Sequence, residues 1–312
     1  MLNKILNNSV GDLDSITKNI DNTIIPEYKS KDQNITQNDL LNKIKQEVEK
    51  IRTYTPKVAI FGDTGVGKSS LCNALFGQDV AKISNVEACT REPQEMLIGD
   101  QNDGGLILID VPGIGEDPKR HQEYIELYKS LLPELDLIIW AIKADDRKYA
   151  SAIDVYENII KPNLQRCPVV FAITQVDKIE PYREWDLKNN KPGETQLANL
   201  DRKRIDIADR FEILPNLIIP ISSTDKYNLE QLVAKIIEVL PNEKKSSFAR
   251  EAKDENISEE TYEKAEKGTW DAIKEQFSDV WDSVKDSVAD VIIATAPKLI
   301  EKGLEFIKNK WF

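Results

Sequence analysis

The sequence predicts an α/β fold, in which a mostly parallel six-stranded sheet is flanked by N- and C-terminal helices. Two observations lead to this fold class. Between residues 56 and 241, short apolar and β-branched runs alternate with amphipathic stretches, an alternation typical of a parallel sheet covered by helices on both faces. Toward both ends the chain is richer in Asn, Lys, Glu and Asp, and its apolar residues recur at helical spacing.

The central region contains six apolar runs with the length of buried strands. They are Lys57–Gly62, Gln94–Gly99, Leu106–Val111, Leu135–Ile142, Val169–Thr174 and Leu217–Ile221. The amphipathic stretches between them predict helices near 68–76, 120–132, 148–160, 196–212 and 228–239. The second and third strands are joined by a short segment with Asp-Gly-Gly and no room for a helix, so we expect an antiparallel hairpin there.

The two ends of the chain are expected to form separate parts. Residues 1–36 predict a loosely ordered polar tail, and residues 242–312 predict a C-terminal helical segment that follows the central domain of residues 56–241. We interpret Asn242–Ser247 as a polar linker and expect another helix after Pro297. Residues 37–55 predict an N-terminal helix, whose apolar face consists of Leu40, Leu41, Ile44, Val48 and Ile51.

Composition argues against several classes of protein. The net charge of −12 and the lack of a long basic block disfavour nucleic-acid binding, which needs Lys and Arg to neutralise phosphates. Three cysteines without close spacing indicate neither a disulfide framework nor a zinc site. The chain has no apolar run of about 18 residues that would span a membrane, and its first residues lack a secretion signal. We therefore expect a cytoplasmic protein.

Residues 62–69 read Gly-Asp-Thr-Gly-Val-Gly-Lys-Ser, directly after a predicted strand and before a predicted helix. In this pattern the glycines let backbone N–H groups turn inward and, with the helix N-terminus, hold nucleotide phosphates. We expect Lys68 to reach the β- and γ-phosphates and the Ser69 hydroxyl to bind Mg²⁺. The other nucleotide-binding residues expected here are Asp63, Thr64, Gly65, Val66, Gly67 and Ser70. A glycine-rich turn without a ligand is the alternative.

Three later segments, each at a strand end, indicate guanine as the base. Asp110 and Gly113 form a D-x-x-G pattern, in which the Asp reaches Mg²⁺ through water and the Gly amide senses the γ-phosphate. In Thr174–Asp177, the carboxylate of Asp177 can accept hydrogen bonds from guanine N1–H and the 2-amino group, donors that adenine lacks. The backbone of Ser222 and Ser223 is expected to donate to guanine O6.

These motifs resemble the TrmE–Era–septin superclass of small GTPases over about residues 56–240. The segments most similar to the bacterial YfjP-like GTPases are Gly62–Phe76, Glu87–Glu92, Asp110–Glu116 and Leu131–Asp146. The resemblance implies a Ras-like P-loop NTPase fold, GTP and GDP as ligands, Mg²⁺ as cofactor and hydrolysis of GTP to GDP. It also implies that Thr90 is the switch I threonine, which makes Lys68 and Thr90 the expected catalytic residues and Ser69, Thr90 and Asp110 the expected metal ligands.

The chain departs from the usual N-K-x-D base motif, because Thr174 and Gln175 replace Asn and Lys. Asp177 is retained, so we expect guanine specificity to survive. Where Ras-like enzymes carry a Gln that orients the attacking water, this chain has Ile114, whose apolar side chain cannot do so. Gly65 stands where some relatives use an Asn to hold K⁺, which gives no support for K⁺ activation. We therefore expect slow intrinsic hydrolysis.

Two classes of function remain open. The first is a switch that engages a protein partner when loops 84–92 and 113–120 become ordered around GTP. The second is a septin- or dynamin-like interaction protein that uses nucleotide to dimerise or to contact the inner face of the membrane. Residues 288–312 place lysines beside a terminal Trp-Phe pair, which suits a lipid interface, although acidic residues weaken the attraction. A helical lobe formed by 37–53 and 248–312 is the alternative to membrane contact.

Overall fold

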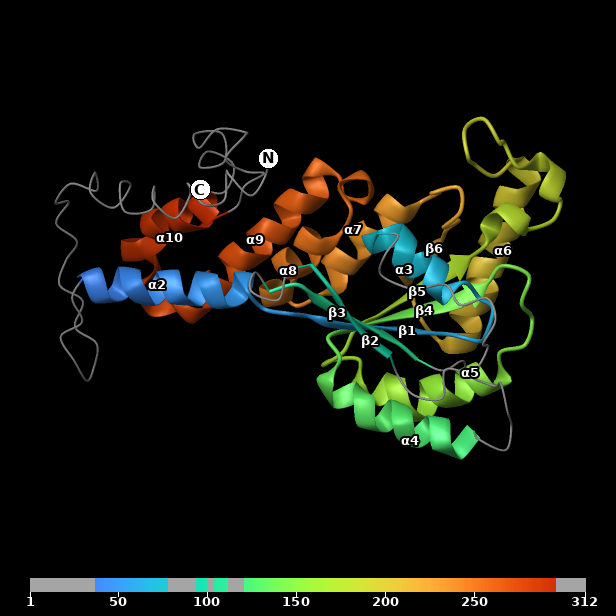
Figure 1. Ribbon diagram of the computed structural model, residues 1–312, viewed down its shortest axis with the longest axis horizontal. Coiled ribbons are helices and arrows are strands. Elements are labelled where there is room, and N and C mark those ends of the chain that lie inside the picture. Colours follow the sequence, from blue (N-terminus) through green and yellow to red (C-terminus); the bar gives the residue numbers. More distant parts are fainter. Residues whose placement is uncertain (1–36, 78–93, 100–103, 112–120, 296–312) are drawn as a thin grey trace. The chain divides into compact units, whose positions relative to one another are not determined.

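The computed structural model describes residues 37–77, 94–99, 104–111 and 121–295. It contains the expected six-stranded sheet (Figure 1), in the order β2-β3-β1-β4-β5-β6. Strand β2 pairs antiparallel with β3, and the other neighbouring strands are parallel. The predicted sheet and hairpin are therefore confirmed. The strands are β1 Lys57–Phe61, β2 Gln94–Ile98, β3 Leu106–Asp110, β4 Leu137–Lys143, β5 Val169–Thr174 and β6 Ile218–Pro220.

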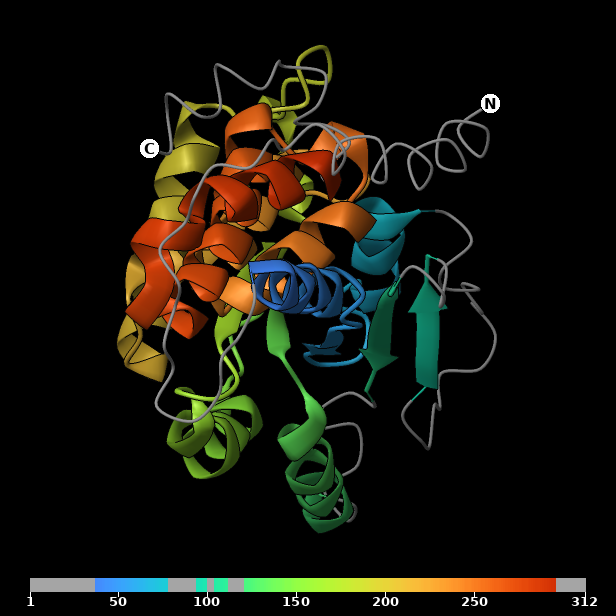
Figure 2. The same cartoon turned by 90° about the vertical axis from the view of Figure 1, so that its left-hand side faces the viewer.

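Helices cover both faces of the sheet (Figures 1 and 2). Helices α4 and α5 lie on one face, and α3 and α7 lie on the opposite face. Strand residues that point toward α4 and α5, such as Phe61 and Trp140, form one core with Tyr156 and with Phe211 of α6. The helices are α3 Lys68–Phe76, α4 His121–Leu131, α5 Ala150–Val155 with a π-helical continuation at Tyr156–Ile160, α6 Glu194–Phe211 and α7 Leu229–Val239.

Residues Asn242–Glu251 form helix α8, so the polar linker that the sequence predicts at Asn242–Ser247 is wrong. Ser246, Ser247 and Phe248 of this helix are buried. Phe248 packs edge-on against Phe76 at the end of α3, with ring centroids 5.7 Å apart. Tertiary packing therefore imposes a helix on a stretch whose composition is typical of a solvated linker.

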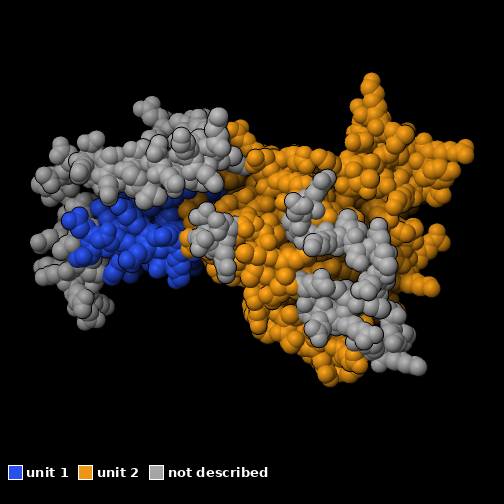
Figure 3. Space-filling view, in the orientation of Figure 1, with its two compact units in different colours: residues 1–51, 266–312 blue, residues 52–265 orange. Residues whose placement is uncertain are grey.

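The chain divides into two compact units (Figure 3). One unit is residues 52–265, and the other combines residues 1–51 with residues 266–312. In the second unit the structure describes most of α2 Gln37–Arg52, the later part of α9 Glu259–Gln276, and α10 Trp281–Thr295. The apolar face expected on α2 is confirmed, because Ile44 and Val48 are fully buried. The helix expected after Pro297 lies outside the described residues.

Helices α9 and α10 are separated by a short 3-10 turn at Ser278–Val280. The rings of Trp270 and Trp281 meet across this break at 4.7 Å in an edge-to-face arrangement. Over the ranges that the structure describes, no helix is both long enough and apolar enough to cross a membrane.

Candidate functional site

The phosphate loop of residues 62–67 follows β1 and leads directly into α3. Gly62, Gly65 and Gly67 all have positive φ angles, of 144°, 78° and 91°, a conformation that glycine adopts readily. At Gly62 a Cβ atom would lie 2.3 Å from the carbonyl oxygen of Ala141 on β4. The loop therefore passes so close to the neighbouring strand that only glycine fits at its first position.

Lys68 is the first residue of α3, and its side chain folds back over the loop. The Nζ atom donates hydrogen bonds to the carbonyl oxygens of Gly62 and Asp63, at 3.1 Å each. The positive charge of Lys68 also opposes the rise in the pKa values of Asp63 and Asp110. The ammonium group is thus hydrogen-bonded to the loop and lies close enough to both carboxyl groups to affect their pKa values.

Asp110 ends strand β3, opposite Ile60 of β1 in the parallel register. Burial raises the pKa of its carboxyl group, and Lys68 partly opposes this rise. Its Oδ1 atom is buried and has no hydrogen-bond partner among the described residues. Since a buried polar atom without a partner is costly, an external donor such as metal-bound water fits this position. A hydroxyl at Ser69 and a carboxylate at Asp110 are oxygen ligands of the kind that Mg²⁺ prefers.

The described ranges contain no cluster of three or more His, Cys, Asp or Glu side chains that could hold a metal ion alone. A Mg²⁺ ion can be held by one or two protein ligands together with nucleotide phosphates. The oxygen ligands at Ser69 and Asp110 fit a Mg²⁺ ion of this kind.

Asp63, the second residue of the loop, has an unusual electrostatic environment. Burial, and then the negative charge of Asp146, raise its pKa to about 6, while Lys68 acts in the opposite direction. Asp146 lies in the turn after β4 and was not among the residues that the sequence predicts at the site. The strand order could have predicted this proximity, because the neighbouring parallel strands β1 and β4 end at the same edge of the sheet.

Thr174 and Gln175, the two departures from the usual base motif, both bind the phosphate loop. Thr174 ends β5 and is 2% exposed, and its hydroxyl donates to the carbonyl oxygen of Val66 at 2.6 Å. The side-chain amide of Gln175 donates to the carbonyl oxygen of Gly65 at 3.0 Å. These two hydrogen bonds fasten the end of β5 to the loop that follows β1.

Asp177 lies in a 3-10 turn at Val176–Lys178, directly after Gln175. The N–H of Val176 donates to the carbonyl oxygen of Ile221 at 3.3 Å, which brings this turn beside the loop that begins at Ser222. Burial, and then the charge of Asp177, raise the pKa of Asp225 in that second loop. The turn that carries Asp177 and the loop after β6 therefore form neighbouring parts of one edge.

In the loop after β6, one of the two backbone amides expected to contact guanine O6 is already hydrogen-bonded within the loop. The N–H of Ser222 donates to the carbonyl oxygen of Tyr227 at 3.2 Å, and its hydroxyl accepts from the N–H of Asp225. The Ser222 amide is thus engaged within the loop. Of the pair expected from the sequence, this leaves Ser223 for contact with a base.

The structure brings most of the expected residues to one edge of the sheet. The phosphate loop with Lys68, Ser69 and Ser70, the end of β3, the turn that holds Asp177, and the loop after β6 all lie at the carboxyl ends of parallel strands, where open α/β sheets bind ligands. Thr90, Gly113 and Ile114 lie outside the described residues.

Comparisons with known proteins match the same region. Residues 57–175 match the family model described as 50S ribosome-binding GTPase. YkfA of Escherichia coli K12 is 37% identical over 200 residues, which cover 64% of this chain and 67% of YkfA. YfjP of the same strain is 36% identical over 206 residues, which cover 65% of this chain and 69% of YfjP. GTPase Era of Aquifex aeolicus is 33% identical over 187 residues, 59% of this chain and only 56% of Era.

Proposed function

Because this chain belongs to a P-loop GTPase family together with YkfA, YfjP and Era, we propose that it binds GTP and GDP with Mg²⁺, hydrolyses GTP and acts as a nucleotide-dependent switch. One observation carries the proposal. The phosphate loop is hydrogen-bonded by Thr174 and Gln175 to the strand end that bears Asp177. A group that binds phosphates and a carboxylate suited to guanine are therefore held at a fixed spacing.

In the proposed mechanism the residues of this chain bind and orient the nucleotide. Lys68 exchanges its hydrogen bonds to loop carbonyls for bonds to the β- and γ-phosphates, while the loop N–H groups hold the same phosphates. Asp177 accepts two hydrogen bonds from guanine, and the Ser223 amide donates to O6. Ser69, Thr90 and Asp110 would hold Mg²⁺, which would neutralise charge on the phosphates.

Intrinsic hydrolysis is proposed to be slow. Ile114 follows the D-x-x-G pattern, and an apolar side chain at this position provides no hydrogen bond to orient the attacking water. A partner, or a backbone group of this chain, supplies that orientation in the proposal. The switch state would then persist until a partner is engaged.

We propose a protein as this partner. The matched family is described as ribosome-binding, but the net charge of −12 does not favour direct contact with RNA. A cytoplasmic location belongs to the same proposal. Val288 and Ile292 of α10 are fully buried, which supports a helical lobe rather than a lipid-facing surface for this part of 288–312.

Calorimetry with GTP, GDP and ATP in Mg²⁺ tests the proposal on the wild type and on Asp177→Ala. We expect GTP and GDP to bind and ATP not to bind. Loss of two hydrogen bonds to a charged group should weaken guanine binding about 10²- to 10⁴-fold in Asp177→Ala. Asp145→Ala, at an exposed carboxylate after β4, is the matched control and should bind like the wild type. Binding of ATP, or an unaffected Asp177→Ala, would show that the base has been misassigned.

A further inference from the structure

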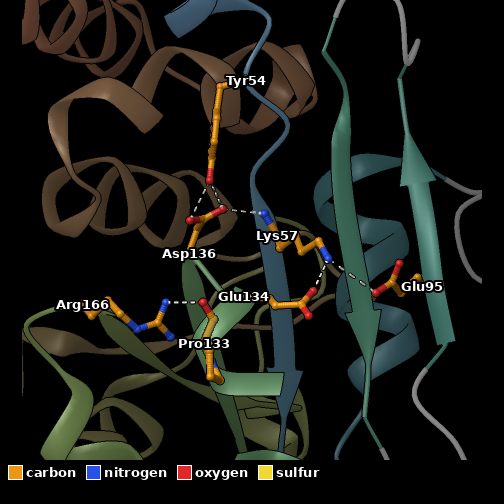
Figure 4. A network of polar contacts seen from close by, with 7 residues as sticks. All are labelled: Tyr54, Lys57, Glu95, Pro133, Glu134, Asp136 and Arg166. Atoms are coloured by element: carbon orange, nitrogen blue, oxygen red, sulfur yellow. Dashed lines mark hydrogen bonds and ion pairs between the residues drawn. The ribbon is translucent and has the colours of Figure 1, made fainter. Parts of the chain in front are cut away.

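Helix α8 and the turn after it belong to the unit of residues 52–265 and pack at the edge of its sheet opposite to the phosphate loop. At this edge lie the β2–β3 turn, the start of β1, the start of β4 and the end of α3. Figure 4 shows part of this region, where Asp136 before β4 accepts hydrogen bonds from the Tyr54 hydroxyl and the Lys57 N–H. Lys244 of α8 donates to the same carboxylate at 2.6 Å.

The end of α8 lies directly on the turn of the β2–β3 hairpin. Arg250 donates from Nη2 to the carbonyl oxygen of Gly105 at 3.2 Å. A Cβ atom at Gly104 would lie 2.8 Å from this guanidinium, and one at Gly99 would lie 2.2 Å from the carboxylate of Glu251. Arg250 and Glu251 also bind each other, with Nε and Oε1 2.6 Å apart. The hairpin turn is therefore in close contact with two charged side chains that hold one another.

The same segment closes the end of α3, the helix that begins at Lys68. The N–H of Lys253 donates to the carbonyl oxygen of Leu75 at 3.0 Å. The side-chain amide of Asn256 donates to the carbonyl oxygen of Ala74 at 2.8 Å, and Asn256 is only 2% exposed. Carbonyl groups at a helix C-terminus need such partners, so α3 depends on residues outside the matched GTPase region for its last turn.

One of the two connections between the units, at residues 51–52, lies at this place. Arg250 donates a second hydrogen bond to the carbonyl oxygen of Arg52, where α2 ends and the unit of residues 52–265 begins. On the other side, α9 begins at Glu259 and continues as one helix beyond Ala265 into the second unit. Arg250 thus joins the hairpin turn to the connection at residues 51–52, whereas the other connection, at residues 265–266, lies within α9.

We propose that α8 couples the nucleotide state of the site to the helical unit, with Arg250 as the residue that links the β2–β3 turn to the connection at residues 51–52. This inference rests on the proposed function. Strand β2 follows loop 84–92 and strand β3 precedes loop 113–120, the two loops expected to become ordered around GTP. Because the hairpin is short, a displacement of β3 at Asp110 also displaces the β2–β3 turn at the other end of the hairpin. A guanidinium forked between fixed carbonyls has few alternative geometries, so such a displacement changes its bonds and biases α8.

Hydrogen exchange of the full chain tests this coupling, with Mg²⁺ and either GDP or a non-hydrolysable GTP analogue. We expect amides in 242–262 to exchange at rates that differ at least ~5-fold between the two nucleotides, the lower range of measured couplings. Since coupling is reciprocal, Arg250→Gln should remove this difference and change the ratio of affinities for the analogue and GDP by a similar factor. Arg202→Gln is the matched control, because Arg202 lies exposed on α6 and bonds Asn199 of the same helix.

The possible results separate this inference from the proposed function. Guanine nucleotide binding with identical exchange in 242–262 for both nucleotides would overturn the coupling and leave the GTPase assignment intact. An Arg250→Gln variant that keeps the exchange difference and the affinity ratio would overturn the role of Arg250. Absence of any nucleotide binding in calorimetry would overturn both proposals. If Arg250→Gln does not fold, exchange in the wild type alone still decides whether the coupling exists.

Discussion

Replacing Asp63 with Asn is expected to stabilise the nucleotide-free protein at neutral pH. Burial and the charge of Asp146 raise the pKa of Asp63 from 3.8 to about 6, against the influence of Lys68. The folded state therefore holds the proton more tightly than the unfolded state does. Between these two pKa values the free energy of unfolding falls as pH rises, and above pH 6 the full cost of the charged carboxylate remains.

The size of this effect follows from the two pKa values. A change from 3.8 to about 6 corresponds to at most ~3 kcal/mol, from ~1.4 kcal/mol per pH unit. Asp63 is only partly buried, and solvent screening reduces the expected gain in Asp63→Asn to ~1–2 kcal/mol at pH 7.5. At pH 4 the gain should fall below ~0.5 kcal/mol, because the carboxyl group is then protonated in the folded state and partly protonated in the unfolded state.

Urea unfolding without nucleotide or Mg²⁺, at pH 4 and pH 7.5, measures this difference. Asp145→Asn is the control, because its exposed carboxylate lies in the turn after β4 and pairs with Lys143, so its unfolding midpoint should change little at either pH. Equal midpoints for wild type and Asp63→Asn at pH 7.5 would refute the argument. A gain of the same size at pH 4 would refute it as well, because the cause would then not be the charge.

Three further substitutions test the site and its supporting structure by unfolding midpoints. Thr174→Val leaves a loop carbonyl without its donor and should cost ~1–3 kcal/mol with weaker GDP binding in calorimetry; unchanged GDP affinity would contradict this role. Gly62→Ala should cost ~3 kcal/mol or more, because the added Cβ atom overlaps β4. At Gly65 an added Cβ atom meets open space, so Gly65→Ala should cost only ~1–2 kcal/mol of backbone strain. Equal losses in the two variants would count against the close approach of Gly62 to β4. Asp136→Ala removes the buried carboxylate that pairs with the partly buried Lys244, and it should cost up to ~3 kcal/mol. Glu134→Ala, at an exposed pair, should have little effect. A small loss in both variants would argue against the network.

The sheet could be predicted because its central strands are buried and therefore read as continuous apolar runs. Strand β5 occupies Val169–Thr174, as the sequence indicates. Strand β4 begins at Leu137 rather than Leu135, because the preceding residues form a 3-10 turn at Leu132–Glu134. The phosphate loop was predictable for a different reason: its glycines are required by backbone geometry, so the pattern of residues alone identifies it.

The contacts of α8 could not be predicted, because most of their acceptors are backbone carbonyl groups. Arg250 donates to carbonyl oxygens that lie 145 and 198 positions earlier in the chain. Every residue has a carbonyl group, so the sequence does not indicate which one is the acceptor. The same limit applies to Thr174, whose hydroxyl binds a carbonyl of the phosphate loop. The proximity of Asp63 and Asp146 required knowledge of strand order.

The division of the helical unit into two stretches has a consequence for how the chain is made. Its first stretch ends at residue 51 and its second begins at residue 266, so the whole of the other unit is synthesised between them. Because domains generally fold as they leave the ribosome, the nucleotide-binding unit can fold while its companion is still incomplete. Ile44 and Val48 are fully buried in the finished protein, but until the second stretch emerges their apolar face remains in water. During translation, α2 therefore presents an exposed apolar face, the kind of surface that chaperones bind.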